Sequence, residues 1–189
     1  MMEALLVSTL VVAIGEIGDK TQLLSLLLAA RFRRPLPIIL GIFCATIANH
    51  SIAATAGAWV RSAMDPELLR WVLGISFVAI AAWALVPDRV DEDSAPAGQH
   101  GVFLLTLITF FVAEIGDKTQ LATVMLAAKY DAIVAVVAGS TLGMLCADVP
   151  AVLLGTAAPL AIPFRAVRWV AAGLFGALGA AALLGFGSL

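Results

Sequence analysis

The seven-residue string Glu-Ile-Gly-Asp-Lys-Thr-Gln occurs twice in this chain, at Glu16–Gln22 and again at Glu114–Gln120. Each copy lies within a long apolar run, where ionisable side chains are rare. A charge at the centre of a membrane helix costs about 3 kcal/mol on an insertion scale, so these side chains must pair, face water or bind an ion. The repeat therefore predicts two matching polar sites inside an apolar protein.

The composition places the chain among integral membrane proteins. Apolar residues make up 62% of its 189 residues and charged residues 13%, whereas soluble domains average about 45–50% and about 25%. A net charge of −2 provides no basic surface for nucleic acid. Because the start of the chain contains Glu3 and lacks a positively charged segment, we expect a retained span and no signal peptide.

The apolar runs predict an all-α membrane protein with six transmembrane helices, since a bilayer span needs roughly 20 residues. The expected spans cover residues 4–30, 37–60, 69–86, 102–128, 132–157 and 165–186. Matches continue beyond the motif at the same offset of 98 residues, and they include Gly41 with Gly139, Gly57 with Gly155, Ala29 with Ala127 and Phe77 with Phe175. These matches predict an internal duplication.

The duplication divides the chain into a first three-helix repeat at 1–86, an acidic cytoplasmic linker at 87–101 and a second three-helix repeat at 102–189. Three spans are an odd number, so the second repeat must enter the membrane in the opposite sense. The result is a pair of inverted repeats, an architecture typical of secondary transporters.

Lysine and arginine in short loops favour the cytoplasmic side of a membrane. The six-span arrangement places six arginines on one side: Arg31, Arg33, Arg34, Arg89, Arg165 and Arg168. Arg61, Arg70 and Lys129 lie on the other side. This difference predicts that both termini lie outside. We expect the membrane itself to be a bacterial inner (plasma) membrane.

The motif suggests its own local geometry. In a continuous helix Asp19 and Lys20 follow Glu16 by three and four residues, so all three share one face and Glu16 can pair with Lys20. Gly18 allows either the close approach of a neighbouring helix or local unwinding beside the carboxylates. The first and fourth spans would be about 40 Å long as helices, which exceeds the roughly 30 Å bilayer core and predicts a tilt or a break.

Two motif copies brought together supply four carboxylates and two ammonium groups, and one divalent cation would neutralise this set. Carboxylate, amide and hydroxyl oxygens suit Ca²⁺, Mn²⁺ or Mg²⁺. The candidate metal ligands are Glu16, Asp19, Thr21, Gln22, Glu114, Asp117, Thr119 and Gln120. The alternative is that each Glu–Lys pair neutralises itself and only holds helices together.

A further set of polar residues within the apolar runs provides candidates for a proton relay or for accessory ligation: Lys20, Lys118, Asn49, His50 and Asp148. Asp148 occupies the position that matches His50 at the repeat offset. An alternative role for Asp148 is to cap a helix that kinks or restarts at Pro150.

Two copies of E-x-G-D-[KR]-[ST], each in the first span of one half of a six-span protein, resemble the GDT family of small membrane cation–proton antiporters. The resemblance covers essentially the whole chain, and both motifs match fully. It implies that Glu16, Asp19, Glu114 and Asp117 bind Mn²⁺ or Ca²⁺, with Thr21, Gln22, Thr119 and Gln120 as supporting ligands.

The leading hypothesis is therefore a secondary transporter that exchanges Mn²⁺ or Ca²⁺ for protons and exports the metal from the cytoplasm, with no cofactor and with a homodimer as one candidate assembly. Carboxylates in a low-dielectric site take up protons readily when they hold no metal, so the two ions can compete for the same oxygens. The runner-up is an exporter of small cationic metabolites such as basic amino acids, because paired carboxylates also bind ammonium groups. An intramembrane enzyme is a third class, but it would need cationic phosphate-binding groups beside the acids.

Overall fold

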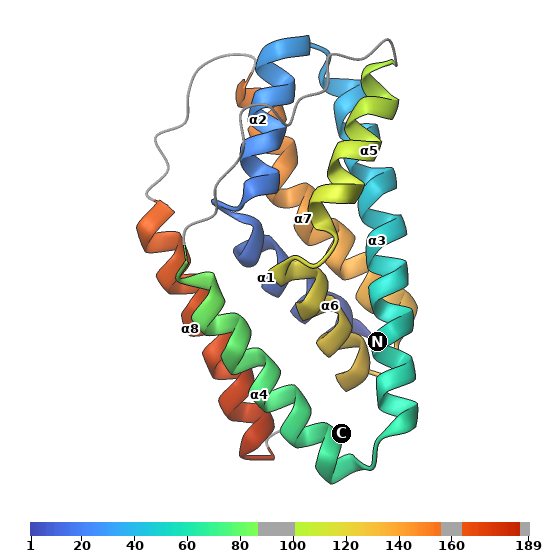
Figure 1. The fold of residues 1–189 in the computed structure, drawn as a ribbon, viewed down its shortest axis with the longest axis vertical. Coiled ribbons are helices and arrows are strands. Elements are labelled where there is room, and N and C mark those ends of the chain that lie inside the picture. The colour runs from blue at the N-terminus through green and yellow to red at the C-terminus, as the bar shows by residue number, and fades with distance from the viewer. Residues whose placement is uncertain (87–100, 156–163, 186–189) are drawn as a thin grey trace.

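A computed structural model describes residues 1–86, 101–155 and 164–185, and these residues form helices and short connections. The helices are α1 (Met2–Glu16), α2 (Lys20–Phe32), α3 (Pro35–Ala63), α4 (Pro66–Ala84), α5 (Val102–Glu114), α6 (Lys118–Lys129), α7 (Ile133–Gly155) and α8 (Phe164–Leu183). Figure 1 shows their arrangement. The expected acidic linker, apart from Gly101, lies outside the described residues, as do Arg89 and the side chain of Arg165.

Four of the six expected spans correspond to single helices, α3, α4, α7 and α8, with ends that differ by a few residues from the expected ones. Of these, α3, α4 and α7 are long and apolar enough to cross a membrane, whereas α5 and the residues 168–183 of α8 are shorter apolar helices. The all-helical prediction is confirmed, and the structure contains three candidate membrane spans among its described residues.

The first and fourth expected spans are both broken, which is one of the two outcomes, a tilt or a break, that their length predicted. The apolar run at 4–30 divides into α1 and α2, and the run at 102–128 divides into α5 and α6. In each case the two helices meet at an angle (Figure 1). Both breaks fall inside the repeated motif, so the motif ends one helix and begins the next.

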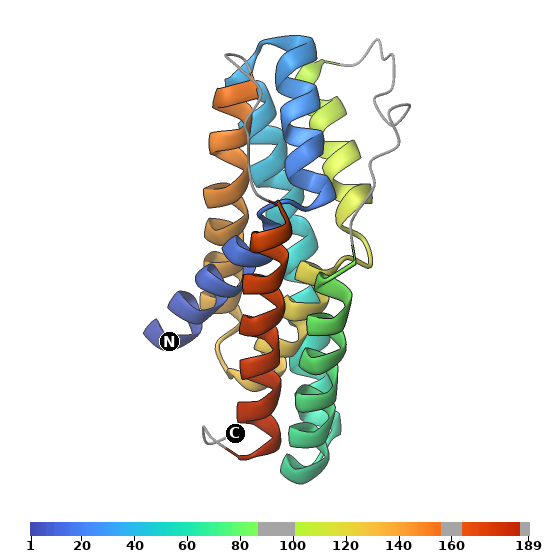
Figure 2. The ribbon, with the colours of Figure 1, turned by 90° about the vertical axis from the view of Figure 1, so that its left-hand side faces the viewer.

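The two halves of the chain are interleaved. The broken pair α1 and α2 packs against α7, and the broken pair α5 and α6 packs against α3, so each pair is supported by the long helix of the other half. Helices α4 and α8 run along each other on one side of the bundle (Figures 1 and 2). Between them the rings of Phe77 and Phe175 stack with centroids 6.5 Å apart and an interplanar angle of 20°.

Glycines at matching positions allow the halves to approach closely. A Cβ atom at Gly57 would collide with the backbone carbonyl of Val124 in α6, and Gly155 approaches α2 in the same way. Gly41 and Gly139 lie equally close to α5 and α1. Small residues at helix interfaces are a main source of packing energy within membranes, where lipid competes for apolar contacts. The glycine matches seen in the sequence therefore mark contacts between the halves.

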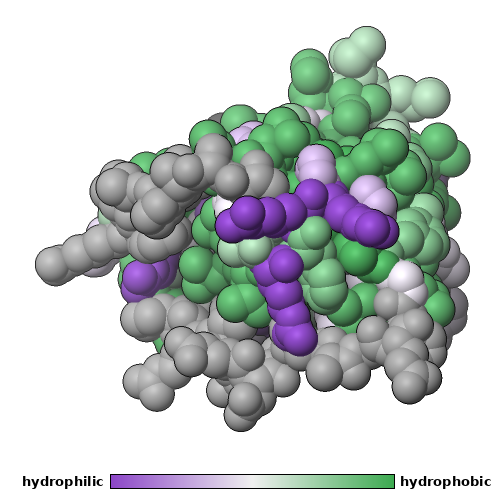
Figure 3. All heavy atoms as spheres, turned by 90° about the horizontal axis from the view of Figure 1, so that it is seen from above, coloured by the Kyte–Doolittle hydropathy of each residue, from purple (hydrophilic) through white to green (hydrophobic). Residues whose placement is uncertain are grey.

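The ends of the bundle carry positive charge. Arg31, Arg33 and Arg34 are exposed around the connection from α2 to α3, and hydrophilic residues gather on this end of the otherwise apolar surface (Figure 3). At the other end of α3, Nη1 of Arg61 donates to the carbonyl oxygens of Ala128 (3.1 Å) and Lys129 (2.8 Å). The two groups lie at opposite ends of α3, whose 29 residues make it about 43 Å long.

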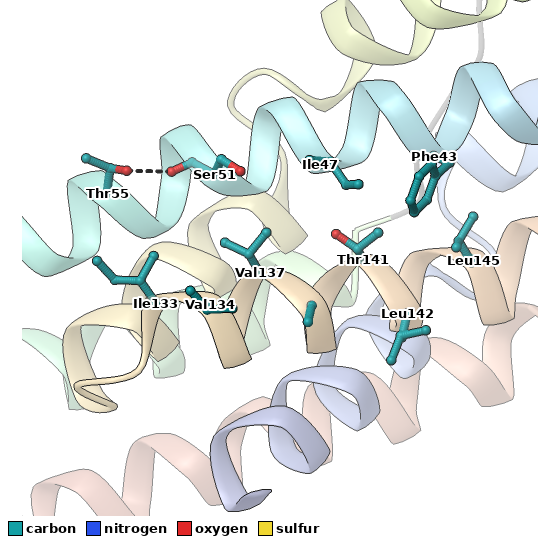
Figure 4. Close-up of a pocket in the computed structure, with 11 residues that line it drawn as sticks. Phe43, Ile47, Ser51, Thr55, Ile133, Val134, Val137, Thr141, Leu142 and Leu145 are labelled. Atoms are coloured by element: carbon teal, nitrogen blue, oxygen red, sulfur yellow. Dashed lines mark hydrogen bonds between the residues drawn. The ribbon is translucent and has the colours of Figure 1, made fainter. Parts of the chain in front are cut away.

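A cavity of about 520 Å³ opens between α3 and α7 (Figure 4). Its lining includes Phe43, Ile47, Val137 and Leu145, and the described lining side chains carry no charge. A divalent cation needs anionic or carbonyl oxygens, so this cavity is not a candidate cation site.

We expect Gly57→Ala to lower the stability of the protein by about 1–3 kcal/mol, because the added methyl group overpacks the contact between α3 and α6. Gly173→Ala is the matched control, since a Cβ at this helical position would meet open space. Thermal unfolding of the purified protein in detergent measures both. Equal melting temperatures for the two variants would contradict the close approach at Gly57.

Candidate cation-binding site

Each copy of the motif bends the backbone in the same way. Helix α1 ends at Glu16, the next residue is extended, and Gly18 has a φ of +83°. In the second copy α5 ends at Glu114, and Gly116 has a φ of +76°. Glycine adopts such positive φ values without strain, whereas most other residues do not. Of the two roles predicted for Gly18, local unwinding is the one that the structure shows.

The break overturns one prediction about the motif. Since the helix stops at Glu16, Lys20 begins a new helix and does not share a helical face with Glu16. The same holds for Glu114 and Lys118. The shared helical face on which each Glu–Lys pair was expected is therefore lost in both motifs, and the expected self-neutralising arrangement loses its geometric basis.

Side chains of the motif stabilise the break. Asp19 caps α2 by accepting from the backbone N–H of Lys20 at 2.7 Å, and Asp117 accepts in the same way from the N–H of Lys118. An acidic cap at a helix N-terminus is favourable because it meets unpaired N–H groups and the positive end of the helix dipole. The two aspartates thus have a structural role beside any role in binding.

The glutamines close the turn on its other side. Oε1 of Gln22 accepts from the N–H of Gly18 at 2.8 Å, and Oε1 of Gln120 accepts from the N–H of Gly116 at 2.7 Å. Their amide groups also reach across the molecule, because Nε2 of Gln22 donates to the carbonyl oxygen of Ala147 at 3.1 Å. The glutamines therefore shape the break, and their oxygens are already engaged.

The two glutamates are buried beside threonine hydroxyls. The hydroxyl of Thr21 donates to Oε2 of Glu16 at 2.6 Å, and that of Thr119 donates to Oε2 of Glu114 at 3.4 Å. Both carboxylates are fully buried. Within the described part of the chain, Oε1 of each glutamate has no hydrogen-bond partner. The two carboxylates also interact electrostatically with each other.

The charges of the motifs are paired across the two halves. Nζ of Lys20 lies 2.8 Å from Oδ2 of Asp117, and Nζ of Lys118 lies 3.3 Å from Oδ1 of Asp19. Both aspartates are almost completely buried. The pairing is reciprocal, so it brings the two motif copies together at the centre of the bundle, as the duplication predicted.

Asp148 also belongs to this cluster. It is fully buried within α7, which continues past Pro150, so the alternative that Asp148 caps a restarting helix is wrong. Oδ1 of Asp148 accepts from the hydroxyl of Ser25 at 2.7 Å, and the carboxylate interacts electrostatically with Glu16. Its Oδ2 has no hydrogen-bond partner among the described residues.

Ser25 was missed by the sequence analysis. A signal was present, since Thr123 stands at the matching position 98 residues later and a hydroxyl recurs there in an apolar helix. The two hydroxyls have different partners. Ser25 donates to Asp148 in α7, whereas Thr123 donates to the carbonyl oxygen of Thr119 in its own helix.

On the matching side of the site, Asn49 accepts from Nε2 of Gln120 at 3.3 Å and donates to the carbonyl oxygen of Phe111 at 3.0 Å. His50 is fully buried, and neither of its ring nitrogens has a hydrogen-bond partner among the described residues. Asn49 therefore positions the second motif, and His50 is the next residue of α3.

The acidic side chains do not form a closed coordination shell in this structure. Among the described residues, no three His, Cys, Asp or Glu side chains lie close enough together to hold a metal ion. The cluster nevertheless concentrates five buried carboxylates, those of Glu16, Asp19, Glu114, Asp117 and Asp148.

Comparison with known proteins assigns the chain to a family. The sequence model described as "Divalent cation/proton antiporter GDT1" matches residues 4–92 and again residues 102–187. The chain belongs to the GDT1 family. It is thus a membrane transporter of a family that exchanges divalent cations for protons, which favours this class over the exporter of cationic metabolites and over an enzyme.

Two relatives illustrate the range of the family. A protein of Vibrio cholerae named "Putative manganese exporter" is 51% identical, over 93% of this chain and 88% of its own length. A GDT1-like protein of Synechocystis is 27% identical, over 82% of this chain and 84% of its own length. No solved structure matches the chain significantly.

We expect Gly116→Val to destabilise the break in the second motif by about 1–3 kcal/mol, because a β-branched residue is strained at a φ of +76°. Gly116→Asn is the matched control, since asparagine tolerates this conformation. No neighbouring atom would contact a Cβ here, so the difference isolates the backbone effect. Melting temperatures of both variants test it, and equal values would refute the strain argument.

Proposed function

We propose that this transporter exchanges Mn²⁺ for protons and exports the metal from the cytoplasm across a bacterial inner membrane. The observation that carries the proposal is the buried carboxylate cluster at two identical helix breaks. The Vibrio cholerae relative, at 51% identity, supports manganese as the metal. Ca²⁺ is the second candidate, because the same hard oxygen ligands suit both ions.

The proposed binding site is centred on Glu16 and Glu114. Each glutamate is the last residue of its helix, where unpaired carbonyl groups and the negative end of the helix dipole favour a cation. Each also retains one buried oxygen without a hydrogen-bond partner in the described chain. Asp19 and Asp117 would complete the acidic ligands, as the resemblance to the family implied.

The other predicted ligands take supporting roles in this proposal. Thr21 and Thr119 orient the glutamates through their hydroxyls, and Gln22 and Gln120 maintain the breaks. Asp148 adds charge on one side of the site and is proposed as an accessory ligand or proton carrier.

We further propose that each broken pair acts as one span, which gives six spans in two inverted repeats, residues 1–86 and 102–189. The matching backbone at Gly18 and Gly116 and the matching contacts of Gly57 and Gly155 support this arrangement. The arginines around Arg31 favour a cytoplasmic position for that end, and both termini would then lie outside.

Exchange follows if metal and protons use the same oxygens. A buried carboxylate without a cation is stabilised by taking up a proton, whereas a bound divalent ion displaces protons. Protons that enter down their gradient would therefore release the metal on one side. Bending at the two glycines provides the local flexibility that access from alternate sides requires.

We expect Glu16→Gln and Asp117→Asn each to lower proton-driven Mn²⁺ flux at least tenfold, because each removes a buried carboxylate while keeping its shape. The assay uses purified protein in liposomes with a metal-sensitive dye and an imposed pH gradient, and it compares Mn²⁺, Ca²⁺, Mg²⁺ and lysine.

Glu67→Gln is the matched control for these variants, since Glu67 is an exposed carboxylate at the start of α4. Near-normal flux in Asp117→Asn would defeat the four-carboxylate site. If the wild-type protein transports lysine but no metal, the exporter of cationic metabolites becomes the better hypothesis.

We expect Asp148→Asn to lower Mn²⁺ flux by a smaller factor, about threefold to tenfold, because asparagine can still accept from Ser25 but carries no charge. Ser25→Ala should have a weaker effect of the same sign. The same liposome assay measures both variants, and flux equal to wild type in Asp148→Asn would remove this residue from the site.

A further inference from the structure

The lysines of the two motifs occupy the oxygens that a transported cation would use. Lys20 is paired with Asp117 and Lys118 with Asp19, each across the two halves. Each lysine is the first residue of the helix that follows a break, and its backbone N–H is held by the aspartate of its own motif. Each lysine thus contacts its own motif through its backbone N–H and the other motif through its side-chain ammonium group.

We propose that Lys20 and Lys118 are tethered cations that compete with the transported metal for Asp117 and Asp19. This inference rests on the proposed function and adds to it a role for the two lysines. A divalent ion bound to the same carboxylate would stand a few ångströms from the ammonium group, and like charges at that distance repel strongly in a low-dielectric site. Binding of the metal therefore requires that the ammonium group leaves the aspartate.

The lysine ammonium groups also stabilise the site after the metal has left. Asp19 and Asp117 are buried, and a buried carboxylate without a compensating charge is strongly unfavourable. When the lysine returns, it supplies that charge and joins the two halves again. The protein can then change conformation without metal, as an exchanger must, while the site remains neutralised.

The two pairs differ in access. The Lys20 side chain is 31% exposed, whereas that of Lys118 is 5% exposed. Fewer protein atoms cover the Lys20 side chain, so its ammonium group can leave the carboxylate with less repacking than that of Lys118. The metal should therefore displace Lys20 first, so that Asp117 is the first of the two aspartates to bind it.

Three variants test this inference by isothermal titration of purified protein with Mn²⁺ at fixed pH and salt. Lys20→Met removes the competing charge and should tighten Mn²⁺ binding about tenfold or more. Lys20→Arg keeps the charge and adds hydrogen bonds to the carboxylate, so it should weaken binding several-fold. Lys129→Met is the control, because Lys129 lies outside the motif beside the ring of Tyr130.

The inference is overturned if Lys20→Met binds Mn²⁺ with wild-type or lower affinity, since the lysine would then only position Asp117. If Lys20→Met does not fold, the arginine variant decides, and affinity equal to or above wild type rejects the competition. Both results leave the proposed function intact, provided that the wild-type protein binds Mn²⁺. A wild-type protein that binds no Mn²⁺ overturns the proposed function and this inference with it.

Discussion

Compensation of buried charge is the constraint on which this structure depends. The motifs place carboxylates among apolar helices, where an unpaired charge is strongly unfavourable. Each motif could in principle have neutralised itself, but the break between Glu16 and Lys20 removes the shared helical face on which the two side chains would pair. The compensating ammonium groups come from the opposite half, so the polar centre is complete only when both halves are packed together. Each broken pair of helices packs against the long helix of the other half, and this packing brings the opposite charges together.

The break itself has a simple physical origin. A helix that stops within an apolar environment leaves N–H and carbonyl groups without partners, and these must be satisfied locally. The motif supplies a glycine for the left-handed turn, an aspartate for the new N-terminus and a glutamine for the turn's own N–H. The glutamate is left at the C-terminal end of the first helix, where a cation is favourable. One short string thus ends a helix, begins another and forms half of a candidate cation site.

The two halves are alike in backbone and unlike in chemistry. Ser25 holds Asp148 on one side, whereas the matching positions carry Thr123, bonded within its own helix, and His50. The accessible pair of Lys20 and the buried pair of Lys118 differ in the same sense. A site built from identical motifs therefore presents unequal surroundings to a cation. Such inequality suits a transporter that must bind its substrate on one face and release it on the other.

Much of this protein was readable in its sequence, because the signals are local or periodic. The lengths of the apolar runs predicted helices, and the offset of 98 residues predicted the duplication, whose matched positions Gly57 and Phe77 prove to lie at helix contacts. The excess length of the first span predicted a tilt or a break. The pairing between side chains could not be predicted from the sequence, because it depends on which helices pack against each other. The assumed pair of Glu16 with Lys20 required a continuous helix, and the link from Ser25 to Asp148 joins residues 123 positions apart. Local sequence determined where the helices end, and only the packing of the two halves decided which charge meets which, since an ion pair is set by proximity in space.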